Sequence, residues 1–271
     1  MVNVAKSIIV GLVILIIYFI WLEKTSYEYF VPKAPIIPQT FGIMTYNIQY
    51  LPWKSKSMSL LRQQTRNYPI LLFQEMFNHL TSIPLPTVFP DYYIVRGKMT
   101  SIRLVNSGLV TMSQYPIISH EFIRFQSNTP YTPEVLSDKG FLACVIQLPT
   151  GNTCFINTHL QSCDHADYDP IVKLQLRQIF DYARALPMPY VIGGDFNIDY
   201  RELSHYEPSR IVAPQQPTIY INLTTAETSS RQKNGYKPYV FDYFFVHPSI
   251  SSQRIETEEN DYSDHNPSFL L

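Results

Sequence analysis

From Phe41 onward, the chain is a series of short apolar runs separated by polar loops. Some runs alternate apolar and polar residues and others are continuously apolar, which are the patterns of half-buried and fully buried strands. The runs that predict strands are FGIMTYN, ILLFQE, YYIVRG, GLVTMS, FLACVIQL, CFINTH, YVIGGD and FDYFFV. Pro149–Asn152 has turn composition and predicts a hairpin between two of these strands.

Two segments have helical character. One lies near Met58–Tyr68, and the other begins at Pro170, directly after Asp169, and continues through IVKLQLRQIFDYARAL. Proline is acceptable as the first residue of a helix because the amide that it lacks has no helical partner there. Since strands outnumber helices, we expect an α/β domain with two packed sheets flanked by helices.

A continuous apolar stretch precedes this domain. Residues 8–22, IIVGLVILIIYFIWL, contain no charged side chain, and Tyr18 and Trp21 are of the type that anchors a helix at a membrane interface. A spanning helix needs roughly 17–25 residues. We therefore expect residues 1–22 to be a single-pass transmembrane signal anchor. A cleaved signal peptide followed by secretion is the alternative, although no small-residue cleavage motif follows Trp21.

The next segment, residues 23–40, is predicted to be a linker. Its prolines, Pro32, Pro35 and Pro38, favour extended backbone over helix. The predicted organisation is thus an anchor over 1–22, a linker over 23–40 and a catalytic domain over 41–271.

Composition narrows the classes of function. The chain has 21 Lys and Arg residues against 22 Asp and Glu residues, a formal charge of −1. Proteins that bind nucleic acid usually carry a basic surface, so nucleic acid is a disfavoured partner. The three cysteines form no CxxC pair, and their odd number at irregular spacing predicts neither a disulfide framework nor a structural zinc site.

Polar residues recur where the predicted strands end. Asn47, Glu75, His159, Asp195 and Asn197 follow apolar runs, and Asp264 and His265 precede the last apolar stretch. One such residue alone is usually a turn former or a cap, but the ends of several strands converge in space. Carboxylate and amide oxygens suit Mg²⁺, and histidine transfers protons near neutral pH. The set therefore predicts metal-assisted hydrolysis of a phosphoester.

The same residues lie in motifs that resemble a known superfamily. TYNIQYLP, LFQEMF, NSGLVTMSQYPI, NTHLQS, GGDFN, FDYFFV and SDH resemble the endonuclease/exonuclease/phosphatase (DNase I-like) superfamily in order and spacing over Phe41–Leu271. YNIQYLP, the QE followed by Met-Phe, SDKG and THLQS are most similar to neutral sphingomyelinases. The resemblance implies a four-layer α/β sandwich of two packed mixed β-sheets flanked by helices, with the site at one open end.

The resemblance also implies roles for individual residues. Glu75 would be the principal metal ligand, Asn47 would lie beside it, and Asp264 would lie next to the metal site. Asp195 and Asn197 would hold the attacking water and the phosphate. His159 would donate a hydrogen bond to a phosphoryl oxygen.

The remaining roles concern proton transfer and a loop. His265 would take a proton from water, and Asp242 would orient its ring; the sequence leaves open whether Asp195 or His265 is the base. Lys139 would lie near the phosphate or act in loop ordering. Asp242 as a plain strand carboxylate and Lys139 as a solvated turn residue are the alternatives.

We therefore expect a phospholipase C-type enzyme that hydrolyses a membrane phospholipid, sphingomyelin, to ceramide and phosphocholine, with Mg²⁺ as the cofactor and Mn²⁺ as the alternative ion. A nuclease or phosphatase of the same superfamily is the second hypothesis. The near-neutral charge and the apolar stretch speak against a nuclease, and the lack of a WCDR-like segment speaks against an inositol-phosphate phosphatase. A membrane-bound pseudoenzyme is the third, but it requires a degraded site, and every motif position is filled.

Overall fold

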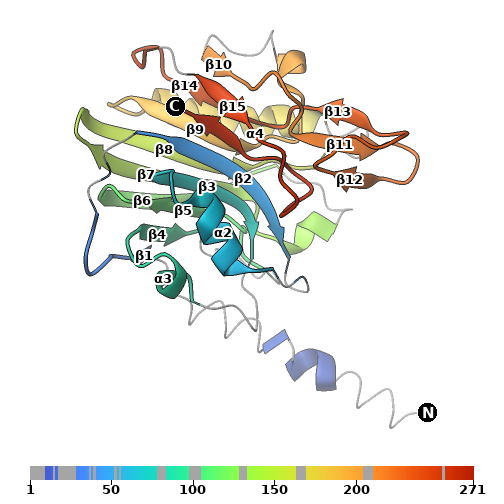
Figure 1. Ribbon diagram of the computed structural model, residues 1–271, viewed down its shortest axis with the longest axis horizontal. Coiled ribbons are helices and arrows are strands. Elements are labelled where there is room, and N and C mark those ends of the chain that lie inside the picture. Colours follow the sequence, from blue (N-terminus) through green and yellow to red (C-terminus); the bar gives the residue numbers. More distant parts are fainter. Residues whose placement is uncertain are drawn as a thin grey trace.

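The computed structural model describes residues 10–14, 16–17, 29–36, 38, 41–51, 54, 56–77, 84–97, 105–127, 133–162, 169–203, 210–251 and 254–271. Two large β-sheets form its centre (Figure 1). Helices are α2 (Met58–Thr65), α3 (Leu85–Val88) and α4 (Asp169–Arg184), with 3₁₀ turns η1 (Pro133–Leu136) and η3 (Tyr200–Leu203).

The first sheet has seven strands. In spatial order they are β1 (Tyr29–Phe30), β4 (Tyr93–Arg96), β5 (Val110–Ser113), β3 (Ile70–Met76), β2 (Ile43–Tyr50), β16 (Ser268–Leu270) and β15 (Ile255–Thr257). Only β2 and β3 run parallel, and the other neighbours are antiparallel. A parallel pair needs a crossover connection, and α2 lies in that connection, capped by the Ser57 hydroxyl accepting from the Leu60 amide.

The second sheet repeats this plan with six strands. In spatial order they are β10 (Arg210–Val212), β14 (Asp242–Val246), β9 (Tyr190–Asp195), β8 (Gly151–His159), β7 (Gly140–Leu148) and β6 (Ile117–Arg124). Its one parallel pair is β8 with β9, and α4 provides the crossover. Each sheet is therefore mixed, with its parallel pair inside the sheet.

A small third sheet, β12 (Glu227–Ser229), β11 (Ile219–Asn222) and β13 (Lys237–Tyr239), stands at the right in Figure 1. It is joined to the main body near the start of β14, where the Thr218 hydroxyl accepts hydrogen bonds from the amides of Phe241 and Asp242.

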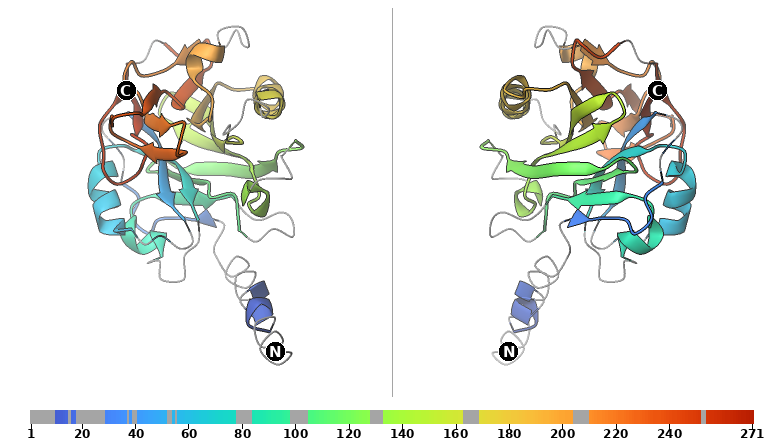
Figure 2. Two further views of the ribbon diagram at one scale, coloured as in Figure 1. Left: turned by 90° about the vertical axis from the view of Figure 1, so that its right-hand side faces the viewer. Right: turned by 90° about the vertical axis from the view of Figure 1, so that its left-hand side faces the viewer.

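Hydrophobic clusters define the layers. Ile43, Leu72, Phe155 and Phe244 belong to a cluster that fills the space between the two sheets. A second cluster packs the outer face of the first sheet against α2, and a third packs the outer face of the second sheet against α4. Figure 2 shows these helices on opposite outer sides. The α/β fold with mixed sheets that the sequence predicted is confirmed.

Two glycines let β9 approach its neighbours closely. A Cβ atom on Gly193 would lie 2.7 Å from the Phe244 ring and 2.8 Å from Leu72 of the other sheet. A Cβ atom on Gly194 would lie 2.0 Å from the Thr158 carbonyl oxygen. Only glycine fits at such contacts, so the GG of the GGD motif sets the position of Asp195 at the end of β9.

The predicted strands all appear, as β2, β3, β4, β5, β7, β8, β9 and β14, and Leu148 pairs with Gly151 across the predicted hairpin turn. The pattern missed β6 and the short strands β1, β10, β11, β12, β13, β15 and β16. Of the predicted anchor, residues 10–14 and 16–17 are helical and the rest lies outside the described residues. No helix in the described part of the chain is both long and apolar enough to cross a membrane.

Part of the predicted linker is docked on the domain. Tyr29 and Phe30 form β1, which pairs with Val95 and Ile94 of β4. The Tyr29 hydroxyl also donates to the Ile117 carbonyl at 2.8 Å. Tyr29 and Phe30 of the predicted linker are thus part of the first sheet.

Candidate active site

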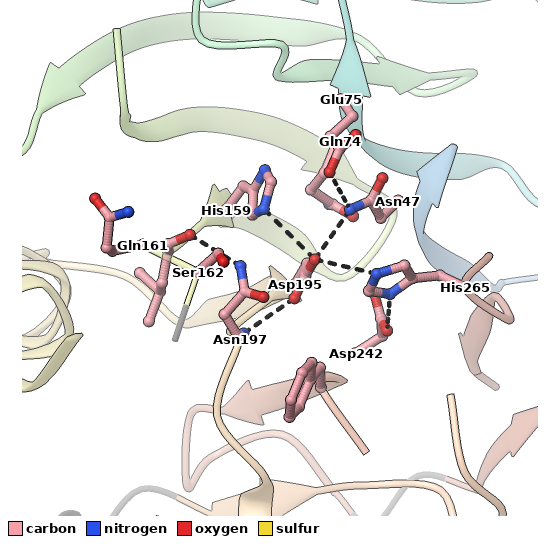
Figure 3. A network of polar contacts seen from close by, with 12 residues as sticks. Asn47, Gln74, Glu75, His159, Gln161, Ser162, Asp195, Asn197, Asp242 and His265 are labelled. Carbon is pink, nitrogen blue, oxygen red and sulfur yellow. Dashed lines mark hydrogen bonds and ion pairs between the residues drawn. The ribbon is translucent and has the colours of Figure 1, made fainter. Parts of the chain in front are cut away.

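Strand register brings the predicted polar residues to one edge of the two sheets. In the first sheet, Asn47 lies opposite Gln74 across the parallel pair β2 and β3. In the second sheet, Asp195 lies opposite His159 of β8 on one side and Asp242 of β14 on the other. The carboxyl ends of the two parallel pairs thus meet, and Figure 3 shows their side chains converging.

Asn47 connects the two halves of this cluster. Its amide nitrogen donates to Glu75 Oε1 at 2.9 Å and to Asp195 Oδ2 at 3.0 Å. Asn47 and Asp195 are almost fully buried. One amide therefore bridges two carboxylates that belong to different sheets.

His265 and Asp242 form a buried pair on the second sheet's side. His265 Nδ1 lies 2.8 Å from Asp242 Oδ2, and His265 Nε2 lies 3.6 Å from Asp195 Oδ2. The loop that carries His265 is fixed to β2 because the Ser263 hydroxyl donates to the Asn47 carbonyl at 2.7 Å. A ring held at one nitrogen with the other facing the site is the arrangement of a general acid–base histidine.

His159 and Asn197 flank Asp195. His159 Nε2 lies 3.5 Å from Asp195 Oδ2, and the Asn197 amide donates to Asp195 Oδ1 at 3.0 Å. The Asn197 side chain donates to the Leu160 carbonyl at 3.0 Å, and Lys139 Nζ donates to the same oxygen at 2.7 Å.

Lys139 also forms an ion pair with Glu134 of η1 at 2.7 Å and is only 5 % exposed. It is therefore a buried cation next to the Asn197 side of the cluster, and the alternative of a solvated turn residue is wrong.

Asp264 lies beside the cluster rather than inside it. Its Oδ2 accepts hydrogen bonds from Gln49 Nε2 at 2.8 Å and from the Thr228 hydroxyl, and its Oδ1 lies 3.2 Å from the Ser263 hydroxyl oxygen. Its predicted place next to a metal ion stays a prediction.

Backbone strain accumulates at the same edge. Glu75 has φ +52° and Asn197 has φ +51°, values in the left-handed region that side chains other than glycine rarely adopt. Asparagine tolerates this region, whereas for glutamate it costs on the order of 1–3 kcal/mol. Such strain persists where the surrounding structure holds it, often at functional sites.

Burial shapes the charges of the carboxylates. Burial raises the pKa of Glu75, although the hydrogen bond from Asn47 opposes this shift. Burial also raises the pKa of Asp195, against the opposing effect of the charge on His265. Removing carboxylates from water disfavours their charged forms, and a nearby cation reverses that effect.

The two histidines shift in opposite directions. Burial, and then the charges of Lys139 and His265, lower the pKa of His159 well below its usual value. Burial alone lowers the pKa of His265 too, but the carboxylates of Asp242 and Asp195 outweigh burial and raise it. His159 is thus neutral at physiological pH, and His265 is the histidine that holds a proton more tightly.

Two overlapping sets of residues fit a metal ion. Asp195, Asp242 and His265 each offer a ligand atom, and these atoms lie within 4.8 Å of one another. However, His265 and Asp242 are hydrogen-bonded to each other, and this favours a role in proton transfer over a role as metal ligands. Glu75 and Asp195 form a pair of carboxylates from the two sheets, held together by the Asn47 side-chain nitrogen while Asn47 Oδ1 accepts from the Gln49 amide. Hard cations such as Mg²⁺ prefer such oxygen ligands. The two sets share Asp195, and we favour the oxygen set.

The structure places all the predicted site residues at this edge. Asn47, Glu75, His159, Asp195, Asn197, Asp242 and His265 form one contact network, and Lys139 and Asp264 lie at its two flanks. Sequence reasoning assigned no role to Gln74 and Asn157, although both lie inside the quoted motifs. Their buried, strand-interior positions gave no signal that separated them from core residues.

The comparisons with known proteins agree with this architecture. The sequence profile of the Endonuclease/Exonuclease/phosphatase family matches residues 44–265, and the chain belongs to this family. The family groups metal-dependent phosphodiesterases and related hydrolases. No curated protein sequence matched the chain.

Several solved structures share the fold. Beta toxin from Staphylococcus aureus is 21% identical with a TM-score of 0.70, covering 86% of this chain and 99% of the toxin chain. Sphingomyelinase C from Streptomyces griseocarneus is 16% identical, with a TM-score of 0.64 and coverage of 85% and 98%. Truncated TDP2 from Caenorhabditis elegans is also 16% identical, with a TM-score of 0.64 and coverage of 85% and 96%. A further beta toxin structure contains bound magnesium ions. At these identities the likeness establishes the fold alone.

Proposed function

We propose that this protein is a divalent-metal-dependent phosphodiester hydrolase that acts on sphingomyelin. The observation that carries the proposal is the convergence of Glu75, Asn47 and Asp195 with the Asp242–His265 pair at one edge of the sandwich. Buried carboxylates and an oriented histidine, brought together from two sheets, provide both an ion site and a proton-transfer group.

Glu75, Asn47 and Asp195 are the residues that would hold the ion. The carboxylate oxygens of Glu75 and Asp195 suit Mg²⁺, with Mn²⁺ as the alternative ion, and Asn47 positions both carboxylates. When bound, the ion supplies charge stabilisation at the phosphoryl group. Burial raises the pKa of Glu75, and a cation bound beside it would favour its charged form.

His265 is the proposed general base. In the neutral ring Nδ1–H donates to Asp242, which leaves an unprotonated Nε2 to take the proton of an attacking water. Against the effect of burial, Asp242 and Asp195 raise the pKa of His265, and a cation held at Asp195 would lower it again, which favours this neutral form. Asp195 is a poorer candidate because its Oδ1 accepts from the Asn197 amide and its Oδ2 accepts from Asn47. The sequence left these two residues open, and their hydrogen bonds favour His265.

His159, Asn197 and Lys139 are proposed to receive the phosphate. His159 is neutral and can donate a hydrogen bond, and Asn197 carries an amide at the edge of the site. Lys139 is a buried cation whose charge acts on both Glu75 and His159. Its attraction to a phosphate would be stronger here than in water, because the buried surroundings have a lower dielectric constant.

Three features support a lipid substrate. The motifs YNIQYLP, SDKG and THLQS are most similar to neutral sphingomyelinases, the formal charge of −1 lacks the basic excess of a nuclease, and residues 8–22 are continuously apolar. We propose that this stretch holds the protein at a membrane as a single-pass signal anchor. A tethered enzyme meets a membrane lipid at high effective concentration.

A parallel substrate assay tests the assignment. The full-length protein in detergent is incubated with sphingomyelin, phosphatidylcholine and DNA in Mg²⁺, and a His265→Ala preparation controls for contaminating enzymes. We expect release of phosphocholine from sphingomyelin, less from phosphatidylcholine, and intact DNA. Cleavage of DNA with no lipid turnover would contradict the sphingomyelinase assignment and leave a nuclease of the same family.

A further inference from the structure

A polar contact between the two sheets lies directly beneath the candidate site. Gln74 Nε2 donates to Asn157 Oδ1 at 2.7 Å, and both side chains are fully buried. Around them the inter-sheet space is apolar, with Leu72, Leu142 and Phe244 among its members. Burying an amide costs free energy unless its hydrogen-bonding groups have partners, whereas apolar side chains in this space would need none.

The amide groups are satisfied almost entirely by the first sheet. Asn157 belongs to β8, yet its nitrogen donates to the carbonyls of Phe73 and Val110, both at 3.0 Å, on β3 and β5. Gln74 Nε2 also lies 3.0 Å from the Leu72 carbonyl and 3.1 Å from the Thr45 hydroxyl. Asn157 therefore fixes the second sheet to the backbone of the first.

Each member of this network lies one or two residues before a residue of the site. Thr45 precedes Asn47 by two positions and Asn157 precedes His159 by two, so in a regular strand each pair faces the same way. Gln74 directly precedes Glu75. The network is thus the layer of side chains immediately below the site on three different strands.

Glu75 depends most on this layer. Leu72 packs between the sheets and Phe73 packs on the outer face, so regular alternation would point Glu75 outward and Met76 inward. Met76 instead packs on the outer face. The positive φ of Glu75 changes the phase of the strand at this point and lets the carboxylate reach Asn47.

We propose that Gln74 and Asn157 are positioning residues that hold Glu75 in its left-handed backbone conformation and fix the Glu75–Asn47 half of the site against the His159–Asp195 half. The inference rests on the proposed function because it assigns Glu75 to the ion. Neighbours that orient metal ligands typically contribute 10–100-fold to affinity or activity.

The test is the affinity of the full-length protein in detergent for Mn²⁺. Electron paramagnetic resonance measures the concentration of free Mn²⁺, so the result does not depend on catalytic activity. Gln74→Met keeps the volume but removes the donor to Asn157, and Asn157→Leu removes the reciprocal side. We expect each to raise the Mn²⁺ dissociation constant at least tenfold. The matched control is Ile70→Val, which weakens packing at the opposite end of the same strand and should leave the dissociation constant within about twofold.

Melting temperatures of all variants are measured alongside. Unchanged Mn²⁺ affinity in Gln74→Met and Asn157→Leu overturns the proposal, and so does equal weakening in Ile70→Val, because the effect would then be general loss of stability. If both amide variants fail to fold, Thr45→Val removes a single contact of Gln74, and wild-type affinity there also contradicts the idea.

The same experiment separates this inference from the proposed function. Tight Mn²⁺ binding that is lost in the amide variants, together with no hydrolysis of any phosphodiester by the wild type, supports the positioning role and contradicts the enzymatic assignment. A wild-type protein that binds no Mn²⁺ overturns the positioning role itself.

Discussion

Asp195 is the residue that most other members of the site touch. Its two carboxylate oxygens receive the amide of Asn197 and the side chain of Asn47, and His159 and His265 each approach Oδ2 within 3.6 Å. A residue with so many partners is suited to orient its neighbours. His265 is better suited to transfer a proton, because Asp242 holds its Nδ1 and its Nε2 faces the site.

Substitution of the histidine pair tests this division of roles. General acid–base catalysis contributes roughly 10²–10⁴-fold, so His265→Ala should lower the turnover number by at least about 10²-fold with little change in melting temperature. Asp242→Asn should also lower it, because the neutral amide no longer stabilises the charged ring and its NH₂ group can hold the other tautomer. The matched control is His247→Ala, since His247 contacts Ser249 and the Tyr190 ring away from the site. Near wild-type turnover in His265→Ala would shift the role of base to Asp195.

At the scale of elements, Asp199 ties the loop after β9 to the segment before β14. Its carboxylate accepts from Arg201 Nε and Nη2, both at 2.6 Å, and from the Val240 amide at 3.0 Å. Burial alone raises the pKa of Asp199, but these hydrogen bonds outweigh burial and lower it. This loop also carries Asn197, so the contact supports one wall of the site.

The lowered pKa of Asp199 predicts a pH-dependent stability. A carboxylate whose pKa is lowered by folding stabilises the fold above its unfolded pKa of roughly 3.9, and this contribution is lost as pH falls through the folded pKa. Asp199→Asn should therefore cost about 1 kcal/mol at pH 7, a modest value because the Arg201 side chain is 61% exposed. The difference in melting temperature from wild type should shrink below about pH 4.

Circular dichroism melts at pH 7 and in acid measure this difference. Asp181→Asn is the control, because Asp181 and Arg184 form an exposed pair on α4 and such pairs contribute little. A gap between wild type and Asp199→Asn that stays constant or widens in acid would contradict the assignment.

The long elements were predictable because their patterns are strong. Strands such as β3 and β9 begin with apolar runs, ILLF and YVI, and α4 has a clear start at Asp169 and Pro170. The pattern missed β6 because most of its residues are partly exposed, and it missed β10, β12 and β15 because three residues are too few to show a period.

The site was predictable in residue types but not in all contacts. Asn47 and Asp195 were found because each polar residue follows an apolar run; Asp195 ends β9, and Asn47 lies within β2 just before an irregularity in its pairing with β3. Gln74 and Asn157 lie inside strands, and only the packing of one sheet on the other shows that they meet. The positive φ of Glu75 is likewise a tertiary effect, because glutamate has no intrinsic preference for it.

At the scale of the whole molecule, the apolar stretch predicts membrane attachment, and the docked strand β1 predicts a contribution to stability. The full-length protein should remain in the membrane fraction through an alkaline carbonate wash, because residues 8–22 are apolar throughout. A chain that begins at residue 27 should be released from the membrane fraction by the wash and should melt at the same temperature as the full-length protein. A chain that begins at Pro38 should melt lower, because it loses β1 and the hydrogen bond from Tyr29. Release of the full-length protein by the wash would point instead to a cleaved signal peptide or peripheral attachment.

The central claim is that the edge of the sandwich built by Glu75, Asn47 and Asp195 is a metal-dependent phosphodiesterase site. The most direct measurement is hydrolysis of the lipid and DNA substrates in EDTA, then with Mg²⁺ restored, for wild type and Glu75→Gln. We predict that EDTA abolishes hydrolysis and Mg²⁺ restores it. Glu75→Gln should require far more Mg²⁺ at an unchanged melting temperature, because a polar isostere at a strand end leaves the core intact. Full activity in EDTA, or equal Mg²⁺ dependence in the two proteins, would contradict the claim.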